Sequence, residues 1–329
     1  MLYIHGLGHF HPPNIIDNRF LESLEIGTTN DWIVSRVGIE QRRTVLPLEY
    51  IRTTKNCCLA AAQEAAEYNN AQCGARAAKM ALARAGVPAS DIGLVVAGGC
   101  SPQWCTPAEA SVIARELEME VPAFDLQAAC STFGAQLHWL AKMGAGLPDY
   151  VLTVMVENNT RVIDYRDRSS CVLWGDGAAA AVVSTKHVGR LRVLQSTFGG
   201  APSGALEVVV QRTGFFSQNG TKVQKFAIKR MVQLFRECQQ GVAEGARDEV
   251  VYVGHQANLT MLRSVARRCE VAGEQHWFNI DRFGNQGAAG APIVVSQRYD
   301  ELEKGQHIGA VVVGAGLSWS GVLLEVVGP

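Results

Sequence analysis

The most informative segment of the chain is Val121-Pro-Ala-Phe-Asp-Leu-Gln-Ala-Ala-Cys-Ser-Thr-Phe-Gly-Ala-Gln-Leu137, with Cys130 near its centre. An apolar run leads in, small residues crowd the turn, and a helical pattern follows, so the pattern predicts a strand-to-helix junction at Cys130. The amide N–H groups and the dipole of a helix N-terminus favour a thiolate, which is a nucleophile. The alternative interpretation is an inert thiol that packs as a small apolar side chain.

The composition of the 329-residue chain is that of a globular protein with an ample core, in one large or two average domains. The net charge of −1 gives no reason to expect nucleic acid or an anionic membrane as a partner. The chain contains no run of about 18 apolar residues, so no transmembrane helix is expected. The segment Met1-Leu-Tyr-Ile-His is typical of a first strand rather than a signal peptide. Nine scattered cysteines without CxxC pairs favour free thiols in a reducing cytoplasm over a disulfide framework or a zinc site.

A faint duplication runs through the chain. The apolar runs at 92–99 and 249–254 are both predicted to be buried strands, and they lie roughly 155–160 positions apart. Buried Val/Ile/Leu strands alternate with amphipathic helices such as 72–85 and 256–269. This alternation predicts α/β layers in which helices cover both faces of the sheets.

Two α/β halves are therefore expected. We predict an N-terminal half at 1–175 that carries the nucleophile and a C-terminal half at 176–329. The segment 44–72 is helical in pattern and polar at its ends. We expect it to be an insertion that packs on the surface or at a subunit interface.

His255 lies in the segment Val251-Tyr-Val-Gly-His-Gln-Ala-Asn-Leu, where it follows an apolar strand and is expected to open the helix 256–269. A helix N-terminus disfavours imidazolium, so the sequence predicts a neutral His255 that donates a hydrogen bond or accepts a proton. Its place in the second half is roughly equivalent to that of a strand-end residue in the first. The alternative is a histidine whose hydrogen bonds are satisfied in the core.

Two further turns are rich in small residues. Asn285 lies in the turn Asp281-Arg-Phe-Gly-Asn-Gln-Gly-Ala-Ala-Gly-Ala-Pro before another helix, where it is either a functional amide or a simple helix cap. The run Val311-Val-Val-Gly-Ala-Gly-Leu-Ser-Trp-Ser-Gly leads from a strand into a glycine-rich loop whose N–H groups can form an oxyanion hole; a plain tight turn is the alternative. The glycines of Trp174-Gly-Asp-Gly are interpreted as structural, because the segment lacks the GxGxxG spacing of a dinucleotide site.

These motifs together resemble a known family. The Ala-Ala-Cys-Ser turn of Cys130, the segment Gly254-His-Gln-Ala-Asn and the segment starting at Phe283 resemble the three active-site signatures of β-ketoacyl-ACP synthase III, in order and in spacing. The segment starting Asp31-Trp-Ile-Val-Ser-Arg is similar as well, and the resemblance covers nearly the whole chain apart from 44–72. It implies a thiolase fold, in which two βαβαβαββ halves form a five-layered α-β-α-β-α sandwich, usually as a homodimer.

The resemblance implies a mechanism and a set of roles. Cys130 attacks an acyl thioester, with the backbone N–H groups of Cys130 and Ala315 as the oxyanion hole. His255 and Asn285 then hydrogen-bond a malonyl- or β-ketoacyl-thioester and stabilise its enolate for Claisen condensation. No metal or redox cofactor is expected; acyl-CoA and an acyl carrier protein are the expected partners, in fatty-acid or specialised lipid and polyketide synthesis.

The resemblance also assigns binding residues. Trp32, Arg36 and Arg168 match positions along the CoA or phosphopantetheine tunnel, where the alternatives are a core contact for Trp32 and solvated surface charges for the two arginines. The expected carrier-protein docking residues, for which a solvated helix face is the alternative, are Lys225, Arg267 and Arg268.

Thr106 marks a departure from the pattern of the acetyl-CoA-primed members of the family. Those members carry a bulky Phe at this position, which closes the acyl pocket across the dimer. A small residue is expected to leave a longer channel, so we predict that Cys130 accepts a medium or long acyl chain.

Two other functions compete with condensation. An acyltransferase of the same fold moves the acyl group to a hydroxyl or amine without forming a C–C bond. The presence of both His255 and Asn285 argues against it, because pure acyl transfer handles no carbanion. A non-catalytic subunit would be expected to lack Cys130.

Overall fold

The computed structural model describes residues 1–328. Within this range, a mixed sheet has the strand order β11-β12-β13-β8-β1-β7-β6-β4-β5, and β2–β3 and β9–β10 form two small separate sheets. The strands are β1 (Leu2–Phe10), β2 (Asn14–Asp17), β3 (Gln41–Thr44), β4 (Ile92–Gly98), β5 (Ala123–Asp125), β6 (Tyr150–Glu157), β7 (Gly177–Ser184), β8 (Leu191–Gly200), β9 (Val208–Val210), β10 (Phe216–Gln218), β11 (Val251–Gly254), β12 (His307–Gly314) and β13 (Ser318–Val326). The α-helices are α1 (Asn18–Ser23), α2 (Asn30–Val37), α3 (Leu48–Thr54), α4 (Leu59–Ala65), α5 (Asn70–Ala85), α6 (Glu109–Glu116), α7 (Thr132–Met143), α8 (Arg168–Cys171), α9 (Gly220–Gln240), α10 (Leu259–Arg268), α11 (Ile280–Phe283) and α12 (Gly290–Gln297).

The large sheet consists of two groups of strands with corresponding orders. The first group is β5-β4-β6-β7-β1, and the second is β11-β12-β13-β8. The groups meet where β1 pairs with β8 through Leu2–Ile4. Beside β11, in the position that β5 takes beside β4, a single parallel bridge joins Tyr252 to His276. This correspondence supports the predicted duplication. The predicted boundary at residue 175 would assign β7 to the second half, although β7 pairs with β6 and β1 of the first group. We therefore propose that the first half ends after Ser184.

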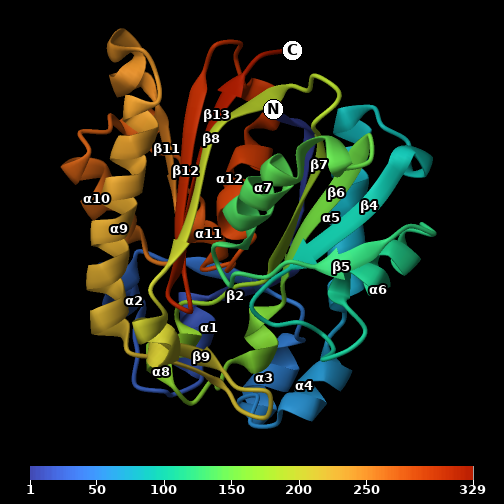
Figure 1. Cartoon of the computed structure of the whole chain (residues 1–329). Helices are drawn as coiled ribbons and strands as arrows, with labels where there is room; N and C mark the ends of the chain where they lie inside the picture. The colour runs from blue at the N-terminus through green and yellow to red at the C-terminus, as the bar shows by residue number, and fades with distance from the viewer. Residues whose placement is uncertain (329) are drawn as a thin grey trace.

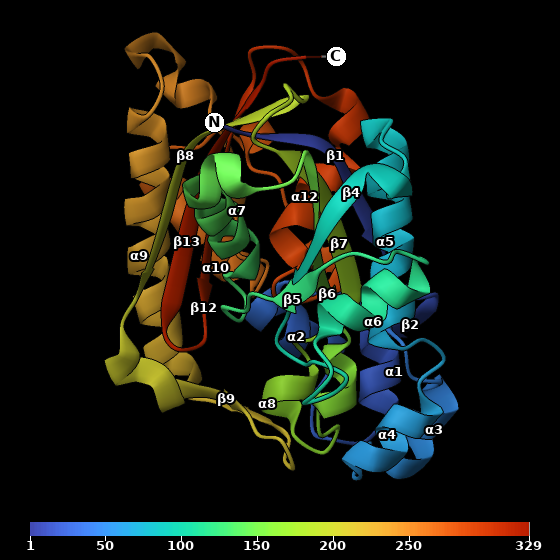
Figure 2. The same ribbon diagram turned by 45° about the vertical axis from the view of Figure 1, so that its right-hand side comes forward.

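The helices form three layers around the two groups of strands (Figures 1 and 2). Helices α5 and α6 cover the outer face of the first group, and α9 and α10 cover the outer face of the second. Helices α7 and α12 lie between the groups and contact strands of both. The five layers α-β-α-β-α follow from this arrangement.

The sequence explains why each helix takes its layer. In α12 every residue from Gly290 to Ser296 is buried, as expected for a helix that is apolar all round and lies between two sheets. In α9 the buried residues follow a helical period along one face, so the opposite face lies in solvent. The buried residues of α9 are Ala227, Met231, Leu234, Phe235 and Cys238.

The helix expected over 256–269 is shorter than predicted. It begins at Leu259, because the Asn258 side chain caps it and accepts hydrogen bonds from the N–H groups of Thr260 and Met261. The prediction that His255 opens this helix is therefore wrong. His255 lies in the turn between β11 and the cap.

The segment 44–72 contains the short helices α3 and α4 and the start of α5, at the lower end of the molecule in Figure 1. The buried Asn56 connects it to the chain after β6, since its Nδ2 donates to the carbonyls of Thr160, Arg161 and Ile163. Within residues 1–328, no helix combines the length and the apolar character that crossing a membrane requires.

Candidate active site

The turns that carry Cys130, His255 and Asn285 converge on one cavity of about 340 Å³. Each of the three side chains lines this cavity, together with Gly314 at the end of β12 and Ala315 in the turn that follows. The residues come from both groups of strands, so the cavity lies where the two halves of the fold meet. The structure thus brings together the three residues predicted to be catalytic and the predicted oxyanion-hole loop.

The Cys130 turn is tight and enclosed. Ala129 has a positive φ of 48°, which is a strained conformation for a residue with a Cβ, and α7 begins two residues after Cys130. Gly314 packs against this turn: a Cβ at Gly314 would lie 2.9 Å from the backbone N of Cys130. Only a glycine lets the β12–β13 turn approach the nucleophile so closely.

A second thiol lies beside Cys130. The Sγ of Cys100, which follows β4, is 3.7 Å from the Sγ of Cys130. The hydrogen bond from Cys100, then nearby His255 and the backbone N–H of Cys130, hold the pKa of the Cys130 thiol below its ordinary value, although burial opposes them. The pKa of the Cys100 thiol is raised, first by that hydrogen bond and then by burial. The pKa of the Cys130 thiol is thus shifted down and that of the Cys100 thiol up, so Cys130 is the more acidic thiol of the pair.

Glu157, at the end of β6, is fully buried behind the two thiols. Its carboxyl group accepts hydrogen bonds from the N–H groups of Cys100 and Ala288, at 3.0 and 2.7 Å, so it connects one turn from each half of the fold. Burial, followed by the charge of the Cys130 thiolate, raises the pKa of Glu157 to about 8. Gly287 is required next to it, because a Cβ there would lie 2.5 Å from the carboxyl group.

His255 is buried at the end of β11, and Gln256 fixes the turn behind it. The side chain of Gln256 donates to Gly254 O at 2.8 Å and accepts from Asn279 N–H at 3.1 Å. His255 Nδ1 is buried and has no hydrogen-bond partner among residues 1–328. This ring nitrogen therefore lacks the hydrogen bond expected of a histidine satisfied in the core.

Asn285 is held through its backbone and through one end of its side chain. Its N–H donates to Leu173 O at 2.7 Å, and its C=O accepts from Gly175 N–H at 3.0 Å. Its Oδ1 accepts from Gly287 N–H at 3.0 Å, which leaves the amide NH₂ as the donor of this side chain toward the cavity. Asn285 does not cap α12, whose N-cap residue is Ala289.

An aromatic and two arginines are gathered at one side of the cavity. Trp32 and Arg36 of α2 line it directly. The guanidinium groups of Arg36 and Arg168 lie 5.7 and 5.0 Å from the centre of the Trp32 ring, within the range of cation–π contacts. The three predicted tunnel residues thus form one cluster, with Arg168 beside the cavity rather than in its wall.

Other predicted site residues lie elsewhere. Thr106 is exposed and does not line the cavity. Lys225 is exposed on α9 close to the residues Thr221 and Gln224 that line the cavity. Arg267 and Arg268 are exposed at the far end of α10, so the structure does not gather the three predicted docking residues in one place.

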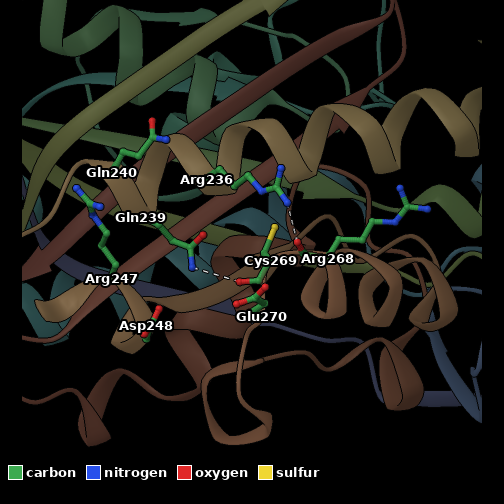
Figure 3. Close-up of a pocket in the computed structure, with 8 residues that line it drawn as sticks. All are labelled: Arg236, Gln239, Gln240, Arg247, Asp248, Arg268, Cys269 and Glu270. Atoms are coloured by element: carbon green, nitrogen blue, oxygen red, sulfur yellow. Dashed lines mark hydrogen bonds between the residues drawn. The ribbon is translucent and has the colours of Figure 1, made fainter. Parts of the chain in front are cut away.

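Arg268 instead lines a second cavity of about 280 Å³, at the opposite ends of α9 and α10 (Figure 3). There the Arg236 side chain donates to Arg268 O at 2.9 Å, and the Gln239 side chain donates to Cys269 O at 3.3 Å. None of the three predicted catalytic residues lies in this cavity. Within residues 1–328, no group of three or more His, Cys, Asp or Glu side chains is placed to hold a metal ion.

Comparison with known proteins identifies the family. Models of 3-oxoacyl-[acyl-carrier-protein] synthase III and of its C-terminal part match residues 124–202 and 244–326. The β-ketoacyl-[acyl-carrier-protein] synthase III of Syntrophomonas wolfei is 31% identical over 340 residues, covering 97% of this chain and 96% of the relative. The chain belongs to the 3-oxoacyl-[acyl-carrier-protein] synthase III family.

Solved structures of this family confirm the thiolase-like fold. The synthase III of Aquifex aeolicus has a TM-score of 0.86 at 28% identity, covering 99% of this chain and 100% of that one. A priming β-ketosynthase from the R1128 polyketide pathway has a TM-score of 0.82 at 28% identity, covering 100% and 97%. The predicted class of function is confirmed with the fold: the protein is an acyltransferase of the synthase III type, a condensing enzyme.

The sequence motifs do not single out Cys100 and Glu157. Cys100 follows the strand predicted at 92–99, and Glu157 is the last residue of β6. That position was the available signal, but it does not say which strand-end side chains reach the nucleophile.

Proposed function

We propose that Cys130 is the acyl-carrying nucleophile of this condensing enzyme and that His255 and Asn285 act on the second thioester. The observation that supports this most strongly is the convergence of the three side chains on one cavity from three separate turns. The catalytic roles follow from the chemistry of each group and its immediate surroundings.

Acylation begins with attack of the Cys130 thiolate on the carbonyl carbon of an acyl thioester. The thiolate is favoured by the hydrogen bond from Cys100, and the departing thiol takes up a proton. The negative charge that develops on the carbonyl oxygen is stabilised by the backbone N–H groups of Cys130 and Ala315. The close packing of Gly314 on the Cys130 turn supports this pairing of donors.

Condensation follows when a malonyl- or β-ketoacyl-thioester enters the same cavity. The NH₂ group of Asn285 and the ring of His255 donate hydrogen bonds to its thioester carbonyl, so that the enolate formed by decarboxylation or deprotonation is stabilised. The enolate carbon attacks the acyl carbonyl on Cys130, and the β-keto product leaves as Cys130 regains its thiolate.

The substrates reach the cavity along the Trp32 side. We assign Arg36 and Arg168 to the phosphate or nucleotide part of a CoA or phosphopantetheine thioester, since guanidinium groups bind phosphate through paired hydrogen bonds. We assign Lys225, beside the cavity, to contact with an acidic carrier protein. We also propose that the enzyme works in the cytoplasm, where thiols such as the exposed Cys105 stay reduced.

We propose a homodimer in which Thr106 borders the acyl channel of the neighbouring subunit. Within residues 1–328, β5 is an edge strand of the large sheet, and the nearby Phe124 and Trp104 are 38% and 52% exposed. An edge strand with exposed aromatic residues is a surface suited to pairing with a second chain. The small Thr106 then leaves room for a medium or long acyl chain.

Two measurements test the proposed function. Mass spectrometry of the enzyme after incubation with a panel of acyl-CoA thioesters should show the acyl group on the peptide that contains Cys130, with chains longer than acetyl preferred. Products formed with malonyl- and β-ketoacyl-thioesters should contain a new C–C bond. The T106F variant should shift the preference toward short chains; loading of Cys130 by acetyl-CoA alone in the unmodified enzyme would contradict the long-chain assignment.

A further inference from the structure

The pair Cys100–Cys130 has a chemistry that condensation does not use. The two sulfur atoms are 3.7 Å apart, both are free thiols, and one of them lines the cavity through which substrates arrive. We propose that the pair is a redox-sensitive modification site, at which a peroxide converts the two thiols into an intramolecular Cys100–Cys130 disulfide that is reversed by thiols.

The geometry favours closure of this bond. The sulfur atoms of a disulfide lie about 2.05 Å apart, so the pair has to approach by roughly 1.7 Å. Cys100 lies in a bend outside any helix or strand, and its sulfur already lies next to that of Cys130. Among the other free cysteines, Cys73 and Cys171 are buried elsewhere in the fold, and Cys105 is exposed on the loop after Cys100.

The two thiols have complementary roles in the reaction. The Cys130 thiolate attacks one oxygen of hydrogen peroxide, the O–O bond breaks, and hydroxide leaves and is protonated to water, which gives a sulfenic acid on Cys130. The Cys100 sulfur then attacks the Cys130 sulfur, the S–O bond breaks, and water leaves with the proton of the Cys100 thiol. In sum, two thiols and one peroxide give one disulfide and two waters.

The consequence is reversible inactivation in place of permanent damage. A sulfenic acid with no neighbouring thiol is oxidised further to a sulfinic acid, which simple thiols do not reduce. Because Cys100 lies next to Cys130, the disulfide forms first and dithiothreitol restores both thiols. Cys100 acts here as a resolving cysteine.

The test uses the intact chain treated with hydrogen peroxide and then digested without reduction. In the C105S variant, which removes the exposed thiol on the same loop and leaves the pair intact, mass spectrometry should find one linked peptide containing Cys100 and Cys130. The linked mass should be two hydrogen atoms below the sum of the two peptides. This readout needs no activity, so its failure is distinct from a failure of the proposed condensation.

The matched comparison is C100S, with C100A as a second variant if C100S does not fold. After peroxide, activity in the C105S protein should return on adding dithiothreitol, whereas the C100S protein should not recover and should carry a sulfinic acid on Cys130. The proposal is overturned if C105S shows no linked peptide and its Cys130 reaches sulfinic acid as fast as in C100S. A link from Cys130 to any other cysteine would overturn it as well.

Discussion

The turns after β4 and β11 take equivalent places in the two groups of strands, and yet they bring different chemistry to the surroundings of Cys130. The first half contributes two thiols, Cys100 after β4 and Cys130 after β5. The second half contributes the imidazole of His255 after β11 and the amide of Asn285 before α12. One half supplies the group that carries the acyl chain, and the other supplies donors for the second thioester.

This difference shows how a duplicated fold becomes an asymmetric catalyst. The backbone of each half brings strand ends and helix N-termini to the middle of the molecule, where α7 and α12 lie side by side between the sheets (Figures 1 and 2). The side chains at these ends are free to differ, because the backbone hydrogen bonds hold the turns. Glu157 joins the halves, with one acceptor bond to each.

Removal of the nucleophile from the first half should have the largest effect. C130A should lower condensation at least about 10³-fold, as expected when a group that acts in concert with its neighbours is deleted. The measurement is steady-state product formation, with acyl loading followed by mass spectrometry. C105S, which removes an exposed thiol outside the cavity, should stay close to the unmodified enzyme; a C130A protein that still forms product would exclude Cys130 as the nucleophile.

Removal of the amide from the second half should separate the two steps. N285A should lower condensation by about 10²–10³-fold, the scale of losing one donor to a developing oxyanion, while Cys130 is still acylated. Single-turnover acylation and product formation are measured on the same sample. If N285A lowered both steps equally, Asn285 would serve both acylation and condensation.

The products of the unmodified enzyme test the alternative function. If it formed ester or amide products and no C–C bond, the alternative acyltransferase function would hold.

Glu157 tests the connection between the halves through the pH dependence of stability. Its pKa is raised to about 8 in the folded protein, so the folded state binds more protons than the unfolded state between the ordinary carboxyl pKa and about 8. Stability from this group is therefore present at low pH and is lost as the pH rises through that window. E157Q, which cannot ionise, should keep at least about 1 kcal/mol more of its unfolding free energy than the unmodified protein between about pH 6 and about pH 9.

Urea unfolding at the two ends of this range measures the effect. The matched control is E116Q, which changes an exposed glutamate of α6 and should leave the pH dependence of stability unchanged. If the unfolding free energy changed equally with pH in E157Q and in the unmodified protein, Glu157 would not titrate in this range.

The smallest effect is expected at the surface, where the structure separates the predicted docking residues. K225E, beside the cavity, should raise KM for a carrier-protein thioester by about twofold to fivefold, the scale of one exposed charge contact, and should leave KM for the matching CoA thioester unchanged. R268E, at the far end of α10, should change neither value. A larger effect of R268E than of K225E would place carrier-protein docking over the cavity of Figure 3.

Much of the fold could be predicted because its signals are local. The strand predicted at 92–99 is β4, which ends one residue earlier, and the predicted helix at 72–85 lies within α5. The helix expected over 256–269 failed at its start, since the cap chemistry of Asn258 outweighs the apolar period. Order and spacing of the motifs were also enough to name Cys130, His255 and Asn285.

By itself, the sequence determined the layers, the duplication pattern, the family and the three residues that line the central cavity. The surroundings of these three residues depend on how the sheets and helices pack. The tertiary structure placed Cys100 against Cys130 and Glu157 behind both, and it left Thr106 outside the cavity of a single chain. The reason is physical: periodicity and capping act over a few residues, whereas the approach of two strand ends depends on how the sheets and the central helices pack.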